Sequence, residues 1–375
     1  MIRGEKMVLV ALLTLSIVCV SCNTQKRNAR WEQSQSDYAK RGLMQSVSLW
    51  EDGFRTAQTP KDFEWWYFDG LFDDGSTVVV WFGHNWLPGQ RGWRISMEIT
   101  PPPGKGENTI SKVWFTDHAD VADVKAAEVR LGKNVFQGDL TTYHIKTEPT
   151  DFAGDGVDLI LKRRVPSWRP GTGYFGDRNK YFGWVVAVPE GSVEGTITVK
   201  GVSKKVTGSG YHDHNFGNIG PDKLMAGWWW GRAQVGQNTV VMADLKQSEA
   251  YGGDHEPLLL ITSPQGVEAS LVGKRDLDVT YDPMALSPDP KGPRPLGTGV
   301  AFAGKKIAAS VHFRSSGKLL GSYDMLEKVP RWQAVAARLI HKSPWYTRVK
   351  ADVELTVYGD TMNNQGTLEY MDFDE

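Results

Sequence analysis

Residues 208–217 place a row of polar and ionisable side chains between glycines. The centre of this segment is Tyr211-His212-Asp213-His214-Asn215. In an extended strand, successive side chains point to opposite faces, so Tyr211, Asp213 and Asn215 share one face and the two histidines share the other. Burying such a row costs free energy unless every group has a partner. The row therefore indicates a functional site, and a polar network that joins two domains is the alternative.

The chemistry that suits this row is acid catalysis. An apolar, aromatic surrounding raises the pKa of a carboxyl group, so that Asp213 stays protonated and can give its proton to a carbon–carbon double bond. Tyr211, His212 or His214 would then orient a water molecule and take its proton. We predict these four residues as the catalytic set.

A second unusual segment is the strand-like run Glu64-Trp65-Trp66-Tyr67-Phe68-Asp69-Gly70. Both of its faces are aromatic, so one face can fill a barrel while the other packs on a neighbouring domain. We expect substrate contacts from Glu64, Trp65, Trp66 and Tyr67. The alternative is a buried central strand in which Glu64 is hydrogen-bonded to the backbone.

Three tryptophans follow in the run Gly227-Trp228-Trp229-Trp230-Gly231-Arg232. Indole faces stabilise a carbocation by ~0.5–2 kcal/mol each when water is excluded, and Trp229 is a candidate for that role. Together with Asn215 and Arg232 it completes the expected substrate-binding set. An aromatic seam between two domains is the other interpretation.

The alternatives to acid catalysis are a metal site, a serine hydrolase and a protein that only binds its ligand. His212-x-His214 is a common metal-ligand spacing, which Asp213 or His255 would complete, but Asp213 points away from both histidines on a regular strand. We therefore expect no metal. The Gly-x-Ser-x-Gly motif of serine hydrolases is not met, because Thr207 lies two residues before Ser209. A carrier that binds an apolar ligand without chemistry stays open.

The elements that position these residues are predicted to be strands. Segments rich in β-branched and aromatic residues alternate with glycine, proline and aspartate clusters, as in an all-β barrel or sandwich. They lie at residues 76–82, 93–99, 157–165, 182–188, 307–313 and 350–357. The length of 375 residues favours two domains, which we place at 46–222 and 223–375. One helix is expected at 330–340, and the proline-rich stretch 283–295 is expected to be a loop or lid.

The amino terminus has the features of an export signal. Basic residues precede a short apolar run at 7–22, which ends in Cys19-Val20-Ser21-Cys22 and resembles a lipoprotein cleavage box with Cys22 as the lipidated residue. We expect a signal peptide at 1–22, a flexible tether at 23–45, and a lipid anchor in a bacterial membrane, with the protein facing the periplasm or the exterior. A secretory signal without a lipid is the alternative. No cysteine follows Cys22, which excludes a disulfide framework, and the net charge of −1 argues against a nucleic-acid partner.

The motifs at 64–70 and 208–217, followed by 228–232, resemble the carotenoid 1,2-hydratase family, also called hydroxyneurosporene synthases. Lipocalin-like relatives of that family include fungal Diels–Alderases and kievitone-type hydratases. The resemblance spans roughly residues 50–375, although Phe216 stands where tryptophan is common. It implies an all-β fold of two tandem lipocalin-like antiparallel β-barrel domains with few short helices. It also implies a proton donor in the Tyr-x-Asp part of the second motif, which is Asp213 here.

These observations give one expectation for function and one alternative. The chain is expected to bind an apolar isoprenoid- or polyene-like ligand and to hydrate or isomerise a double bond of it, as a hydro-lyase that needs no cofactor. The alternative is a membrane-anchored carrier of a lipid, quinone or pigment.

Overall fold

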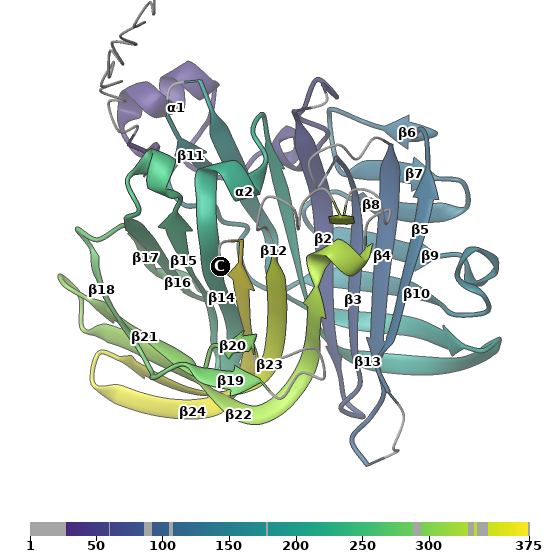
Figure 1. The fold of residues 1–375 in the computed structure, drawn as a ribbon. Coiled ribbons are helices and arrows are strands. Elements are labelled where there is room, and N and C mark those ends of the chain that lie inside the picture. Colours follow the sequence, from purple (N-terminus) through teal and green to yellow (C-terminus); the bar gives the residue numbers. More distant parts are fainter. Residues whose placement is uncertain are drawn as a thin grey trace, which may run out of the picture.

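The computed structural model describes residues 28–59, 61–85, 92–104, 108–177, 179–287, 294–328, 334–335 and 344–373. Within these residues two large antiparallel sheets curl side by side, with only short helices at their edges (Figure 1). The all-β prediction is confirmed. A third, two-stranded ribbon lies beside the second sheet.

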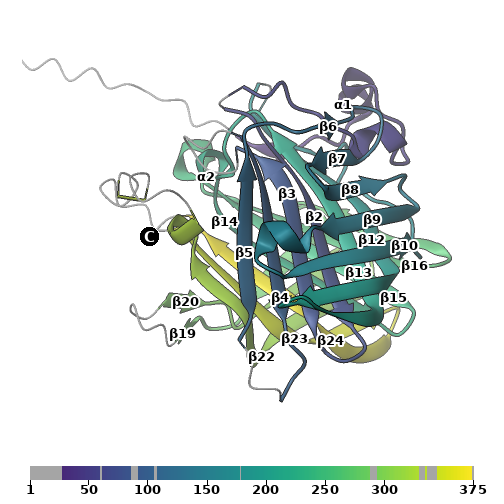
Figure 2. The same cartoon turned by 90° about the vertical axis from the view of Figure 1, so that its right-hand side faces the viewer.

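The first sheet contains the strands numbered up to β13. Its strands are β1 Arg30–Trp31, β2 Phe63–Phe72, β3 Thr77–His84, β4 Trp93–Thr100, β5 Ile110–Thr116, β6 Val121–Ala122, β7 Glu128–Leu131, β8 Asn134–Gly138, β9 Thr142–Thr147, β10 Gly156–Arg163, β11 Tyr174–Gly176, β12 Tyr181–Val199 and β13 Val202–Gly217. Strands β8, β9 and β10 cross the direction of β3, β4 and β5, so the sheet folds over its own core (Figure 2).

The second sheet and the ribbon contain the remaining strands. They are β14 Met225–Val235, β15 Asn238–Gln247, β16 His255–Ser263, β17 Gly266–Val272, β18 Leu277–Tyr281, β19 Ala285–Ser287, β20 Arg294–Leu296, β21 Gly299–Gly304, β22 Ala309–Asp324, β23 Trp345–Val357 and β24 Asp360–Asp372. The helical elements that lie wholly within the described residues are α1 Gln35–Arg41, η1 Leu49–Asp52, η2 Pro149–Phe152, α2 Pro221–Leu224, η3 Glu249–Tyr251 and η4 Met325–Lys328.

Alternation along β2, β3 and β4 divides their side chains between two environments. On one face Trp66, Phe82 and Ile95 are fully buried inside the first sheet. On the other face Trp65 and Trp81 join a second core that continues into the other sheet. Both faces of these strands are therefore apolar, because one side fills a barrel and the other side meets its neighbour.

The two sequence motifs are neighbouring strands. β13 pairs with β2 in a register that sets Asp213 opposite Tyr67 and Asn215 opposite Trp65. On its other side β13 pairs with β12, which sets Asn215 opposite Trp184. The tight turn between β12 and β13 uses Lys200 (φ 50°) and Gly201 (φ 78°), the left-handed pair that a two-residue hairpin requires. The hairpin thus sets where β13 begins to pair with β12.

Buried charges connect the two sheets. Asp69 of β2 accepts from Arg232 Nε of β14 at 2.6 Å and also pairs with Arg348 of β23. All three side chains are almost completely buried. Burial raises the pKa of Asp69, but the two guanidinium groups outweigh it and hold that pKa below its usual value. The carboxylate is therefore a charged link between the two halves of the chain.

Residues 28–45 differ from the flexible tether that we expected. Trp31 is buried against Phe175, with ring centroids 5.3 Å apart, and β1 pairs with β11. Ser34 caps α1, and Arg41 forms an ion pair with Glu32 at 2.9 Å. The correction has a simple cause, since one tryptophan and a capped helix give this polar stretch enough contacts to fold onto the first sheet.

The structure only partly covers the remaining predictions about segments of the chain. The chain passes from the first sheet to the second between Gly217 and Met225, and the proposed domain boundaries stay a prediction. Of the stretch 283–295, the structure describes residues 283–287, which include the short strand β19, and the first two residues of β20, whereas residues 288–293 lie outside the described residues. The expected helix at 330–340 lies outside them as well, apart from residues 334–335. The signal peptide at 1–22 is also outside the described residues.

Candidate functional site

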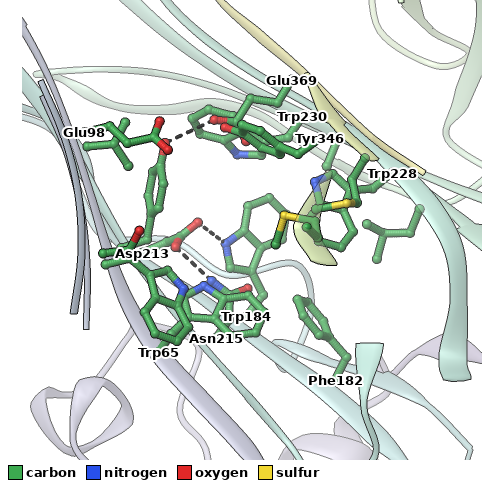
Figure 3. Close-up of a pocket in the computed structure, with 18 of the residues that line it drawn as sticks. Trp65, Glu98, Phe182, Trp184, Asp213, Asn215, Trp228, Trp230, Tyr346 and Glu369 are labelled. Atoms are coloured by element: carbon green, nitrogen blue, oxygen red, sulfur yellow. Dashed lines mark hydrogen bonds between the residues drawn. The ribbon is translucent and has the colours of Figure 1, made fainter. Parts of the chain in front are cut away.

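A pocket lies between the two sheets. It contains about 1020 Å³ of space not filled by atoms, including the part open to solvent. The first sheet contributes residues such as Trp65, Tyr67, Trp81, Arg94, Trp184 and Asp213, and the second contributes residues such as Trp228, Trp230, Ala243, Tyr346, Glu369 and Met371 (Figure 3). Indole and phenol rings dominate this surface. A concave, largely aromatic pocket with a few polar groups is typical of a site for an apolar small molecule.

Asp213 lies on the pocket wall with both carboxylate oxygens engaged. Trp184 Nε1 donates to Oδ2 at 2.8 Å, and the Tyr211 hydroxyl donates to the same oxygen at 2.7 Å. Asn215 Nδ2 donates to Oδ1 at 2.8 Å (Figure 3). The side chain is buried, with 6% of the residue exposed. The carboxyl group is therefore held in one orientation at the edge of an enclosed space.

The surroundings of Asp213 oppose its ionisation. Burial raises the pKa of the carboxyl group to about 6, although hydrogen bonds from Tyr211 and Trp184 act in the other direction. An apolar ligand that displaces water from the pocket would raise this pKa further, because it removes solvation of the charged form. Asp213 thus has the proton affinity of a general acid that works near neutral pH.

A second carboxyl group faces the pocket from the other sheet. The Tyr67 hydroxyl donates to Glu369 Oε1 at 3.1 Å, which connects β2 to β24 across the interface (Figure 3). Burial raises the pKa of Glu369 to about 7, although the charge of Arg348 opposes this. The pocket therefore contains two carboxyl groups with raised pKa values, one on each wall.

His212 and His214 point away from the pocket into the first barrel. His212 Nε2 lies 3.1 Å from Asp52 Oδ2, and the Tyr143 hydroxyl donates to the same oxygen at 2.5 Å. Burial lowers the pKa of His212, but the charge of Asp52 and the hydrogen bonds with Asp52 and the Tyr67 backbone together outweigh it and raise that pKa. Both histidines are fully buried and neither lines the pocket. Strand alternation explains this placement, and it separates the histidines from the ligand space where we had expected them to act.

Glu64 and Trp66 belong to the same internal network. Glu64 Oε1 lies 2.8 Å from His214 Nε2, and its other oxygen accepts from Thr56. Burial raises the pKa of Glu64, but the hydrogen bonds with His214 and His84 outweigh it and lower that pKa to about 2. Trp66 stacks on His214 with ring centroids 4.5 Å apart. Both residues are fully buried, and neither lines the pocket.

The tryptophan run is divided between two surroundings. Trp229 lies in the core of the second sheet against Tyr370, with ring centroids 4.9 Å apart. Trp228 and Trp230 line the pocket instead. The choice of Trp229 as the ring that faces the ligand is corrected, because it points to the opposite side of β14 from its two neighbours. Arg232 is likewise outside the pocket and pairs with Asp69.

Of the residues predicted to act on a ligand, the structure places four on the pocket surface, namely Asp213, Asn215, Trp65 and Tyr67. Tyr211 does not line the pocket, but its hydroxyl group donates a hydrogen bond to Asp213, which does. Sequence reasoning missed Trp184, Arg94 and Glu369. Trp184 had a usable signal, because it is a tryptophan in a segment predicted to be a strand. Arg94 and Glu369 had none, since they are single charged residues in ordinary strands whose position depends on how the two sheets meet.

The described residues contain neither a metal-binding cluster nor a membrane-spanning helix. No group of three or more histidine, cysteine, aspartate or glutamate side chains is arranged to hold a metal ion in this part of the chain. Among the same residues, no helix is long and apolar enough to cross a membrane.

The fold and the pocket together define a class of protein: two lipocalin-like antiparallel barrels in tandem, with an aromatic ligand pocket between them. No family model matches the chain. Over 218 residues it is 22% identical to the hydroxyneurosporene dehydrogenase of Chlorobaculum tepidum, a match that covers 48% of this chain and 56% of that protein. The chain thus matches little more than half the length of that curated relative.

Solved structures share this fold over most of the chain. CghA in complex with Sch210972 has a TM-score of 0.60 at 14% identity, covering 84% of this chain and 89% of that one. Kievitone hydratase from Nectria haematococca has a TM-score of 0.58 at 12% identity, covering 93% and 98%. A putative ATTH from Nitrosomonas europaea has a TM-score of 0.57 at 13% identity, covering 86% and 97%. The resemblance to the lipocalin-like hydratase and Diels–Alderase group is confirmed, and at these identities it establishes the fold.

Proposed function

We propose that this protein hydrates a carbon–carbon double bond of an apolar, isoprenoid- or polyene-like substrate, with Asp213 as the acid and without a cofactor. The observation that supports this most is the buried Asp213 carboxyl group on the wall of an aromatic pocket, with its pKa raised to about 6. The likeness to a kievitone hydratase and to a hydroxyneurosporene dehydrogenase supports the class of reaction and of substrate.

The proposed reaction balances with one acid group. The Asp213 carboxyl group gives its proton to one carbon of the double bond, and the other carbon becomes a carbocation. The indole faces of Trp65 and Trp230, which line the pocket, stabilise that cation. A water molecule adds to the cation through its oxygen, and the proton that it loses returns to the Asp213 carboxylate. The product contains one added water, and the enzyme is back in its starting state.

The test is incubation of the purified protein with acyclic polyenes, both hydrocarbons such as neurosporene and lycopene and polyenes that carry a carboxylate, in water labelled with heavy oxygen. We expect a product heavier by one labelled water, and its rate should fall as the pH rises above about 6, because only protonated Asp213 can act. A rate that also falls on the acid side of about 7 would assign the second proton transfer to Glu369. A rate that does not change across this range would contradict the acid role.

One observation favours a second function. Three hydrogen bonds to the Asp213 carboxylate, from Trp184, Tyr211 and Asn215, are also what a fixed anion needs. In that case the protein is a carrier that binds an apolar lipid, quinone or pigment without changing it. Ligand that is recovered chemically unchanged after prolonged incubation, at every pH tested, would support the carrier.

We further propose that the protein is exported and anchored to a bacterial membrane through a lipid on Cys22. The support is the sequence pattern alone, a basic start, an apolar run and the terminal Cys19-Val20-Ser21-Cys22. Expression of the full chain should give a membrane-bound form whose first residue is a lipidated Cys22, as read by mass spectrometry. Cys22→Ala should release the protein from the membrane fraction, and a Cys22→Ala protein that stays membrane-bound to the same extent would contradict the anchor.

A further inference from the structure

An arginine with no carboxylate partner among the described residues lies in the pocket wall. Arg94 is on β4, and only 6% of the residue is exposed. Its Nε and Nη1 atoms are buried, and neither has a hydrogen-bond partner. Within the described residues, no carboxylate oxygen lies within ion-pair distance of it, although the other buried arginines at this interface, Arg232 and Arg348, pair with Asp69. Arg94 is thus an exception in a protein that pairs its buried charges.

The guanidinium group is oriented toward the ligand space. On β4, Trp93 and Ile95 point into the first barrel, whereas Arg94, Ser96 and Glu98 line the pocket. The guanidinium carbon lies 4.4 Å from the centre of the Trp81 ring, so the charge contacts the indole on the pocket wall. Glu98 lines the pocket from the same face of β4, but no ion pair joins it to Arg94.

An unpaired buried guanidinium group is costly for the free protein. Burial lowers the pKa of Arg94 to about 10, which leaves the group charged at neutral pH. A buried charge without a counterion destabilises the fold, so a ligand that supplies the counterion would gain affinity from it. Arginine matches a carboxylate better than any other side chain, because its parallel N–H groups meet both oxygens.

We infer that the apolar ligand of this pocket carries a carboxylate or similar anionic oxygen group, which Arg94 binds. The aromatic walls take the apolar body, Asp213 faces it from β13, and Arg94 fixes one end from β4. The inference rests on the proposed function only in taking the pocket to bind an apolar molecule. It adds the chemical class of the ligand, and it predicts the orientation of the bound ligand, with its anionic end at Arg94.

The test compares two probes that differ only in the anionic group, all-trans-retinoic acid and all-trans-retinol, with binding followed by quenching of tryptophan fluorescence. Wild-type protein should bind the acid roughly tenfold or more tightly than the alcohol, the effect of one charged hydrogen-bonded pair. Arg94→Met and Arg94→Gln should lose this preference and keep the affinity for retinol. Arg130→Met, a change at an exposed arginine on β7, should keep the preference.

Stability provides an independent measurement on the same variants. Arg94→Met keeps the length of the side chain and its packing on Trp81 but removes the unpaired charge, so the melting temperature of the ligand-free protein should rise. A fall in that temperature would overturn the inference, because it would mean that the guanidinium group is satisfied within the protein. Equal affinity of wild type for both probes, or an unchanged preference in Arg94→Met, would overturn it as well. Failure to bind either retinoid would instead count against the apolar-ligand function itself.

Discussion

Asp213→Asn is expected to reduce turnover by about 10²–10⁴-fold, the usual contribution of a general acid, while the affinity for the polyene substrate stays nearly unchanged. Asparagine has the shape of aspartate but no acidic proton to give. The aromatic surfaces that hold the apolar body, such as Trp65 and Trp230, are not altered by this change. The measurement is a pair of assays on the same preparation, one for hydrated product and one for binding by fluorescence quenching.

Two companion variants make this result specific. Asp158→Asn removes an exposed carboxylate on β10, outside the pocket, and should leave both turnover and binding as in wild type. Tyr211→Phe removes a hydrogen bond that lowers the pKa of Asp213, so the alkaline fall in rate should move to higher pH. Full activity in Asp213→Asn would remove this residue from the reaction, and the carrier function would then explain the pocket better.

Asp69→Asn is expected to destabilise the folded protein by about 3–5 kcal/mol, the cost of breaking a buried ion pair by removing one partner. The change leaves Arg232 and Arg348 buried without their shared carboxylate. Because these arginines come from the second sheet and Asp69 comes from the first, the variant should mainly weaken the contact between the two barrels. Urea unfolding followed by tryptophan fluorescence measures it, and a broadened or two-step transition would show that the halves separate.

The matched control for this variant is an exposed ion pair within one sheet. Lys162 and Glu194 lie 2.7 Å apart on β10 and β12, and both side chains are more than half exposed. Glu194→Gln should leave the urea midpoint unchanged, since solvent already screens that pair. An Asp69→Asn protein as stable as the Glu194→Gln protein would mean that apolar packing alone holds the barrels together.

Local sequence patterns were enough to predict the fold and one wall of the pocket. Branched and aromatic segments separated by turn residues predicted the strands, and the two motifs predicted the two-barrel fold. Alternation also gave the correct face for Asp213 and Asn215, because side-chain direction along a strand depends only on residue spacing. The aromatic residues on both faces of β2 had the physical reason proposed for them, one side in a barrel and the other at the interface.

The remaining parts of the site depend on long-range geometry. His212 and His214 looked like catalytic groups, yet each has a carboxylate partner, Asp52 or Glu64, that lies about 150 residues or more away in the sequence. Glu369 and Arg94 become pocket residues only because β24 and β4 face each other across the interface. No local pattern indicates which distant strand will lie opposite, so these residues could not be found from the sequence.

The two faces of β13 have different roles in the proposed mechanism. The face with Asp213 and Asn215 meets the ligand space, and the face with His212 and His214 stabilises the first barrel. The histidine network and the carboxyl group of Asp213 thus occupy adjacent positions but serve different purposes. A variant of either histidine should therefore affect stability before it affects chemistry.

The central claim is that the space between the barrels binds an apolar molecule beside Asp213. Native mass spectrometry of the mature protein from its own cells, followed by lipid extraction, tests it most directly. We predict a one-to-one complex with an apolar molecule, which is lost in Ala243→Trp, where a large ring fills the pocket, and retained in Val202→Trp, where the same ring is added at an exposed site. A wild-type protein without bound ligand, or a ligand that stays bound in Ala243→Trp, would contradict the account.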